Sequence, residues 1–343
     1  MSLNKFELHL SELCNLDNIS NELRDIKRVL SNSLDSLDEN YPLYQTINDC
    51  EQVKNFSVKL TWAKEKSGFK NLKSKLLNKT RKDFDSAFAT INFAYNLEKY
   101  GFKLIKFEPK NGKGGRADLM LKFDTDDCVF WELSRMDEPK IQKTITDLLK
   151  NFPKVFCYGE LNLDNYFVKT PNERIDIDNE IQDALNDSFD KIENDVSKKL
   201  VLHKHIRDIF DIHLYNSTDK EFIDSLLWPV KTGAGGVLNL KITEDKRIES
   251  KISKELSQLP ENVPGVVLVY GPGPLINTKE KLSDSINPFF KNNPNLISII
   301  LSNSNYQLNL NPTIDNTFKL SSTLKKIKEV FSNQNILIEL FSN

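Results

Sequence analysis

The segment VPGVVLVY, residues 263–270, restricts the fold more than any other part of the chain. A strand with one solvated face alternates apolar and polar residues, whereas an unbroken β-branched run is typical of a central strand buried on both faces. A second short apolar run follows at 296–301. We therefore expect an α/β fold in which helices flank both faces of a mixed central sheet.

Length and composition narrow the class of protein. The 343 residues, of which 39% are hydrophobic and 28% charged, allow roughly two units of about 150 residues with a sizeable core. No window approaches the roughly 18 apolar residues of a membrane span, and the N-terminal MSLNKFELHL does not resemble a signal peptide. The four cysteines are far apart and lack CxxC spacing. These features predict a soluble protein of the reducing cytoplasm that does not contact a membrane.

The near-neutral net charge of −2 conceals two local asymmetries. Residues 54–82 contain ten basic residues and one acid, whereas residues 173–195 contain nine acids and two basic residues. Each run can be a solvated helix face. The basic run can instead contact phosphates, and its candidate nucleic-acid-binding residues are Lys70, Lys73, Lys79 and Arg81.

Hydrophobic periodicity divides the chain into four parts. We expect a helical, basic N-terminal region at 1–82, the first part of an α/β core at 83–159, a helical acidic insertion at 160–230, and the rest of the core with a C-terminal extension at 231–343. The expected strands are 102–107, 117–123, 128–134, 236–242, 263–270 and 296–301, and the principal helices are 83–100, 176–200, 245–259 and 282–290.

Two acids, Asp118 and Glu132, occur at matching points of the expected strand pair 117–123 and 128–134. The thirteen residues between them suit a tight hairpin, in which both carboxylates converge at one end of the sheet. Glu132 follows the apolar residues Val129, Phe130 and Trp131, and a buried carboxylate needs a partner or a metal ion. Paired carboxylates favour a hard cation, so we expect Mg²⁺, or Mn²⁺, at this site.

With its motif residues Ala117-Asp118 and Glu132-Leu133-Ser134, this part of the chain resembles the PD-(D/E)xK, or restriction endonuclease-like, nuclease superfamily. The family core has the order α-β-β-β-α-β, which helix 83–100, the hairpin, helix 245–259 and strand 263–270 match. The resemblance covers about half of the chain and rests on a short motif. It implies that an acid of the preceding helix, here Asp85, completes the metal site, with Glu108 as an alternative.

The chain departs from the family motif at its lysine, which is replaced by Ser134. In the family this lysine orients the attacking water and stabilises transition-state charge. Three possibilities follow. A lysine of a nearby helix replaces it, with Lys143 and Lys251 as the leading candidates beside Lys140 and Lys254; or Arg135 or Lys122 substitutes in part; or the fold binds its partner without cleavage.

Other motifs carry less information. The glycine-rich turn NGKGGR lacks the spacing of a phosphate loop, although Lys113 and Arg116 can contact a nucleic-acid backbone. Three histidines, at 203, 205 and 213, are close enough in sequence to suggest a metal cluster. On a helix the first two point apart, so we expect surface or packing residues instead.

The sequence therefore favours a divalent-metal-dependent endonuclease acting on DNA, with RNA possible and a homodimer plausible because two copies can cut both strands of a duplex. The alternative is an inactive nuclease fold that serves as a nucleic-acid-binding or assembly module. A third hypothesis is an interaction protein whose long acidic helix docks a partner.

Overall fold

The structure is a computed structural model, and its chain forms two compact units, one of residues 1–136 with 248–343 and one of residues 137–247. The expected insertion is therefore wider than 160–230. The residues described are 5–13, 15–30, 41–47, 49–78, 80–112, 115–136, 140–150, 155–194, 201–216, 237–241, 244–270, 279–302, 307–310, 318–333 and 340.

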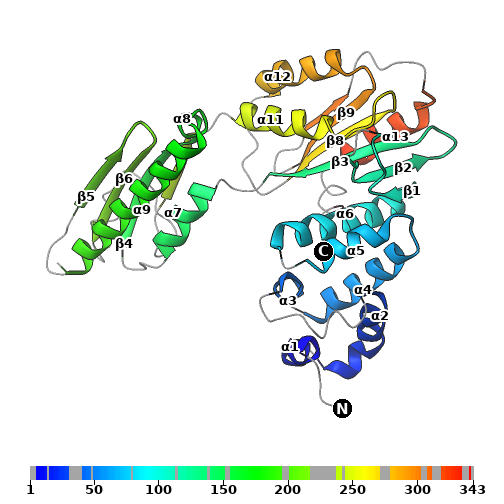
Figure 1. Cartoon of the computed structure of the whole chain (residues 1–343), viewed down its shortest axis with the longest axis horizontal. Coiled ribbons are helices and arrows are strands. Elements are labelled where there is room, and N and C mark those ends of the chain that lie inside the picture. Colours follow the sequence, from blue (N-terminus) through cyan, green and yellow to red (C-terminus); the bar gives the residue numbers. More distant parts are fainter. Residues whose placement is uncertain are drawn as a thin grey trace. The chain divides into compact units, whose positions relative to one another are not determined.

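A six-stranded mixed sheet forms the centre of the first unit, in the order β1-β2-β3-β8-β9-β10 (Figure 1). The first three strands are antiparallel, β3, β8 and β9 are parallel, and β10 is antiparallel to β9. The prediction that the first four of these strands share one mixed sheet is confirmed. The strands are β1 (Phe102–Phe107), β2 (Leu119–Phe123), β3 (Val129–Arg135), β8 (Gly265–Tyr270), β9 (Leu296–Ser302) and β10 (Gln307–Leu310).

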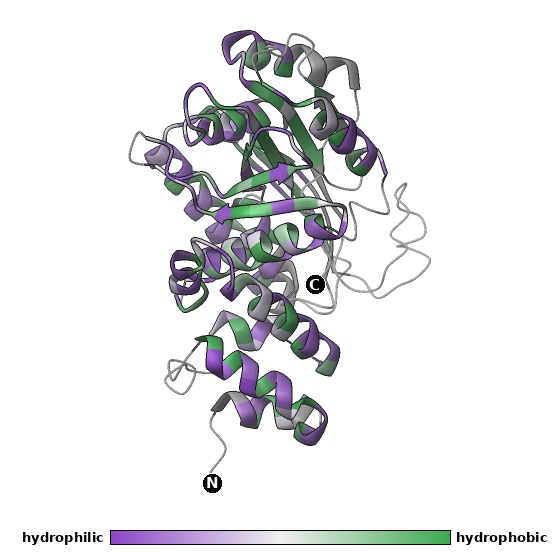
Figure 2. Ribbon diagram, turned by 90° about the vertical axis from the view of Figure 1, so that its right-hand side faces the viewer, coloured by the Kyte–Doolittle hydropathy of each residue, from purple (hydrophilic) through white to green (hydrophobic). Residues whose placement is uncertain are grey.

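Helices cover both faces of this sheet (Figure 1). One face packs against α6 (Arg81–Lys99) and α13 (Ser321–Phe331), and the other against α11 (Glu244–Leu256) and α12 (Lys279–Asn292). Five residues of β8 are buried in succession, as expected for the VPGVVLVY run, and the central strands are hydrophobic in Figure 2. None of the helices in the described ranges is long and apolar enough to cross a bilayer.

The N-terminal helices share a core with the sheet. Buried side chains of these helices and of α6 belong to the same hydrophobic cluster as Trp131 of β3. The N-terminal region is therefore helical, as expected, and is an added layer of the first unit. Its elements are α1 (Lys5–Leu13), a 3-10 turn (Leu16–Ile19), α2 (Ser20–Leu30), α3 (Pro42–Thr46), α4 (Cys50–Lys64) and α5 (Phe69–Leu76).

The second unit has a sheet of its own, so the expectation of a purely helical insertion is wrong. Its four strands have the order β5-β6-β4-β7, and α9 packs on them through Ile177, Ile181, Leu185 and Phe189. Its elements are α7 (Lys140–Lys150), β4 (Val155–Asn162), α8 (Leu163–Phe167), α9 (Pro171–Asn194), β5 (Val201–Ile206), β6 (Phe210–Asn216) and β7 (Val237–Lys241).

Candidate functional site

Asp118 and Glu132 lie opposite each other on neighbouring strands. Asp118 directly precedes β2, in which Leu119 pairs with Trp131 of β3. The N–H of Asp118 donates to the carbonyl of Trp131 at 3.1 Å, and the N–H of Leu133 donates to Asp118 Oδ2 at 2.8 Å. These main-chain bonds hold the Asp118 carboxylate against β3, where a hydrogen bond joins it to the Glu132 side chain.

The two carboxyl groups share a poorly solvated environment. Glu132 is only 1% exposed, whereas Asp118 keeps some contact with solvent. Burial, reinforced by the charge of Asp118, raises the pKa of Glu132 well above its ordinary value. Burial also raises the pKa of Asp118, against the opposing effect of its hydrogen bonds from Leu133 and Glu132. Without a cation, Glu132 therefore stays protonated, and its O–H donates a hydrogen bond to the Asp118 carboxylate.

One oxygen of this pair has no hydrogen-bond partner among the residues that the structure describes. Oε1 of Glu132 is buried and makes no hydrogen bond within the described part of the chain. An unsatisfied buried carboxyl oxygen is costly in a folded protein. Oε1 of Glu132 can therefore accept a bond from a cation or a water molecule.

Lys75 of α5 brings a positive charge to these acids. Its Nζ lies 2.5 Å from Oε1 of Glu108, a residue that is 6% exposed at its side chain and follows β1 directly. Although burial has the larger effect, the Lys75 charge lowers the pKa of both Asp118 and Glu132. Glu108 in turn donates its main-chain N–H to the carbonyl of Asp118 at 2.9 Å. The lysine thus stands beside a row of three acids on adjacent chain segments.

A glycine sets the approach of α5. Gly68 precedes the helix with φ of 88°, and a Cβ at this position would lie 2.0 Å from the carbonyl oxygen of Phe107. Beside it, the N–H of Phe107 donates to the carbonyl of Ser67 at 2.8 Å. The turn before α5 is therefore in direct contact with the end of β1, which places Lys75 near Glu108.

The position of the family lysine has a different partner. Ser134 Oγ donates to Oε1 of Glu255 at 2.8 Å, and Glu255 is a buried residue of α11. The Gln258 side chain donates to the other oxygen of Glu255, and the Gln258 carbonyl accepts a hydrogen bond of 3.1 Å from Asn111. This network ties α11 to the β1–β2 loop and adds a further carboxylate next to the pair.

Two sequence candidates for the site have other partners. Asp85, expected as a metal ligand, pairs with Arg81 and Arg135 at 2.9 Å each, on the α6 side of the sheet. Glu108, the alternative, is the acid that joins the row. Lys251 reaches β3, but its Nζ donates to the carbonyl of Arg135 at 3.1 Å. The structure therefore supports Glu108 over Asp85 as the neighbour of Asp118.

The remaining candidates are distributed around the first unit. Lys143 lies on α7, which belongs to the second unit, so its role stays a prediction. Lys70 and Arg116 are exposed, and Lys73 is half-buried on α5. Arg81 is exposed and contacts Asp85. Two further candidates, Lys79 and Lys113, lie outside the described residues.

Sequence reasoning did not assign Lys75 or Glu255. Lys75 was visible only as one of ten basic residues at 54–82, and nothing in that run distinguished it. The same run is not one solvated surface, because Lys59 is 7% exposed and Lys66 pairs with Glu98 at 2.7 Å. Tertiary packing therefore divides the basic residues between core, ion pairs and site.

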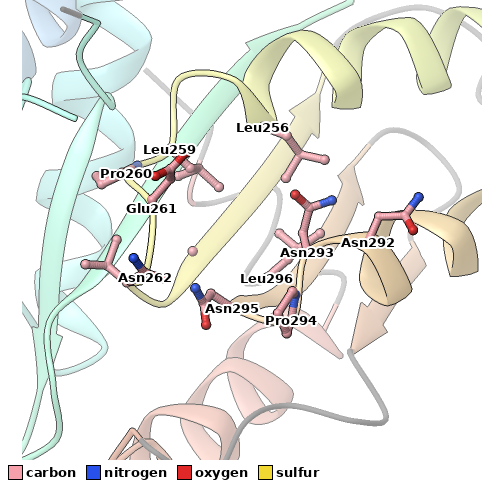
Figure 3. Close-up of a pocket in the computed structure, with 12 residues that line it drawn as sticks. Leu256, Leu259, Pro260, Glu261, Asn262, Asn292, Asn293, Pro294, Asn295 and Leu296 are labelled. Atoms are coloured by element: carbon pink, nitrogen blue, oxygen red, sulfur yellow. The ribbon is translucent and has the colours of Figure 1, made fainter. Parts of the chain in front are cut away.

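A separate pocket of about 280 Å³ lies where β8 and β9 begin (Figure 3). Asparagine, proline and leucine side chains of the two preceding loops line most of it, including Leu259, Asn262 and Asn295. Neither Asp118 nor Glu132 lines it. We therefore place the candidate chemistry at the carboxylate row.

Comparison with known protein families, with characterised proteins and with solved structures finds no match for this chain.

Proposed function

We propose that this protein is a divalent-metal-dependent nuclease that hydrolyses phosphodiester bonds at Asp118 and Glu132. The observation that carries the proposal is the buried cross-strand pair of carboxyl groups, with Lys75 beside it. With the second unit inserted between β3 and α11, the order α6-β1-β2-β3-α11-β8 is similar to the α-β-β-β-α-β order of a restriction endonuclease-like core, and this similarity supports the proposal.

The carboxyl pair fits a divalent cation. Asp118 and Glu132 would hold the ion, because Oε1 of Glu132 is buried with no hydrogen bond from the described residues and both groups resist ionisation in the absence of the ion. Two anionic oxygen ligands suit Mg²⁺ or Mn²⁺ and leave positions for water and a phosphate oxygen. When bound, the ion would polarise the scissile phosphate and lower the pKa of a bound water.

Lys75 would supply the positive charge that Ser134 cannot. Its ammonium group is held by Glu108 and lies close enough to lower the pKa of both site acids. A cation fixed at this position can orient an attacking water and stabilise the additional negative charge of the transition state. Arg116 lies 3.9 Å from the other oxygen of Glu108 and extends the positive edge of the site.

The substrate would be a nucleic-acid backbone, with DNA as the first choice and RNA as the alternative outcome. Lys70, Lys73 and Lys75 all lie on α5, so the helix that carries the site lysine carries further basic residues. Such a basic helix next to buried acids allows phosphates to approach despite the local negative charge.

The test is cleavage of supercoiled plasmid DNA and of single-stranded RNA by the full chain, with Mg²⁺ or Mn²⁺ and with EDTA. We expect metal-dependent cleavage that falls by about 10²-fold or more in Glu132→Gln and Asp118→Asn. Both substitutions preserve side-chain shape, and Asp118→Asn keeps an acceptor for the N–H of Leu133. Binding to DNA in EDTA should persist in both.

Lys75→Met tests the substitute lysine and should lower cleavage about 10²-fold. Its matched control is Lys328→Met, an exposed lysine of α13. Equivalent changes at Lys143 and Lys251 test the two other lysines. If Lys75→Met keeps full cleavage activity and the change at Lys143 or at Lys251 abolishes it, the catalytic role belongs to that other lysine.

The second candidate function is binding without cleavage on the same fold. The observation in its favour is that Ser134 is engaged by Glu255, which adds an acid near the pair where the family has a lysine. If the wild-type protein cuts no DNA or RNA with either metal, yet binds nucleic acid with a steep salt dependence, this second function replaces the first.

A further inference from the structure

The hairpin of β5 and β6 gathers two histidines and an aspartate on one face of the second sheet. His203 is paired directly with His213, and Asp211 is two residues before His213 on the same strand. Side chains two residues apart on a strand point to the same face. The three side chains therefore converge although ten positions separate the first from the last.

Their ligand atoms are close together. One carboxylate oxygen of Asp211, Oδ1, contacts Nε2 of His203 and lies 3.9 Å from Nε2 of His213. The two imidazole rings stack with centroids 4.2 Å apart and an angle of 12° between their planes. One ligand atom from each of the three residues lies within 4.8 Å of the other two.

This spacing is close to that of a metal site. Bonds of 2.0 to 2.2 Å in tetrahedral geometry place ligand atoms roughly 3.3 to 3.6 Å apart. The His203, Asp211 and His213 side chains are 51%, 40% and 35% exposed, so small ring rotations can bring their atoms to that spacing. Two imidazole nitrogens and one carboxylate oxygen are the ligands of borderline transition-metal ions.

One face of the hairpin packs into the core of the second unit, whether or not an ion is bound to the other. Ile206, Ile212 and Leu214, which point to the opposite face, are buried in the core of the second unit. Their packing fixes the register of the two strands, so a bound ion would order only three side chains. A preorganised site loses less conformational entropy on binding.

We propose that His203, Asp211 and His213 bind one divalent transition-metal ion of the Zn²⁺ type, with water in its remaining position. The site is separate from the carboxylate pair and does not depend on the nuclease function. The ion would link β5 to β6 and stabilise the second unit, as binding to the folded state alone requires.

The experiment measures Zn²⁺ binding to the full chain by titration calorimetry, with excess Mg²⁺ to occupy sites made only of oxygen ligands. We expect one tight equivalent in the wild type. Loss of an outer-shell partner typically lowers metal affinity by about 10- to 100-fold. We expect a larger loss of Zn²⁺ affinity in each of the three ligand variants, His203→Gln, Asp211→Asn and His213→Gln. The matched control is His205→Gln, an exposed histidine opposite Asp211 that does not belong to the cluster. It should bind as the wild type does.

Co²⁺ provides a second measurement that does not depend on heat. Its visible absorption should indicate nitrogen and oxygen ligands, and a thiolate charge-transfer band would assign the equivalent to cysteine and overturn the proposal. Circular dichroism of the metal-free protein identifies any variant that fails to fold. If one does, the result for His203→Gln decides whether the site exists, because His203 is the most exposed of the three ligands. Equal weakening in all four variants, or in none, would also overturn the three-ligand site.

Discussion

Polar residues have different environments in the two sheets of this protein, buried in the first and partly exposed in the second. The six-stranded sheet is covered by helices on both faces, so a carboxyl group such as that of Glu132 is not solvated and needs a partner within the protein or a bound ion. In the four-stranded sheet, buried Ile212 and Leu214 alternate with Asp211 and His213, which are partly exposed. Polar side chains are ordinary on such a face. Burial made the first cluster visible from sequence, whereas the second becomes visible only once its residues are placed on paired strands.

The same comparison separates two kinds of cation chemistry. The first sheet offers carboxyl oxygens in a buried pair, which suit a hard ion. The second offers imidazole nitrogens at an accessible surface, which suit a borderline transition metal. If burial, rather than residue type, controls the behaviour of each sheet, substitutions in the two sheets should have very different effects.

The largest effect is expected from the core of the six-stranded sheet. Trp131 is fully buried among Phe93, Phe102 and Phe331. Trp131→Ala should lower the free energy of unfolding by about 3 to 5 kcal/mol, measured by urea denaturation followed by circular dichroism. His205→Ala, on the exposed face of the other sheet, should change it by less than about 0.5 kcal/mol. Similar costs at both positions would contradict the difference in burial.

The pH dependence of stability should report the buried acids. Because the pKa of Glu132 is raised in the folded state, that state binds more protons than the unfolded chain above the ordinary glutamate pKa. Stability of the metal-free protein should therefore fall as pH rises from about 4.5 towards about 11. Glu132→Gln should remove most of this slope and stabilise the protein at pH 8 by about 2 kcal/mol.

Urea denaturation across this pH range, with EDTA or with Mn²⁺, measures the effect. Mn²⁺ should restore stability to the wild type at high pH and leave Glu132→Gln nearly unchanged. A wild type whose stability does not depend on pH in EDTA would mean that Glu132 is not held in its protonated form.

The glycine that positions α5 provides a smaller, matched effect. Gly68 and Gly112 both have positive φ, of 88° and 82°, but only at Gly68 would a Cβ meet another atom within 4 Å. Both alanine variants pay the conformational cost. Gly68→Ala should therefore lower the free energy of unfolding by about 1 kcal/mol more than Gly112→Ala, and only Gly68→Ala should lower cleavage by moving Lys75. Equal effects would mean that α5 adjusts without loss.

Much of the first sheet could be predicted because its strands have strong local signals. The run at 263–270 required burial on both faces, and the short spacing of Asp118 and Glu132 required a hairpin. The docking of α5 has no such signal. Lys75 reaches the acids because Gly68 contacts Phe107. Hydrophobic periodicity does not predict such a tertiary contact.

The error at the second sheet has a different cause. The strong helical period of 176–200 was extended into the following residues. Yet Ile206, Phe210, Ile212 and Leu214 are buried with period two on either side of a turn at 207–209, where Arg207 has φ of 50°. This alternation was present in the sequence and would have placed the histidines on strands.

The smallest expected effect concerns the basic face of α5. Lys70 and Lys73 are three residues apart on this helix, and Lys325 and Lys328 have the same spacing on α13. Each phosphate contact contributes about 0.9 to the slope of log K against log salt concentration. The double variant Lys70→Ala, Lys73→Ala should therefore reduce the slope by about 1 to 2 in fluorescence anisotropy with duplex DNA, whereas Lys325→Ala, Lys328→Ala should leave it unchanged. If both pairs change the slope equally, the nucleic acid does not approach by α5, and Lys75 would be a structural partner of Glu108 instead of a residue that meets the substrate.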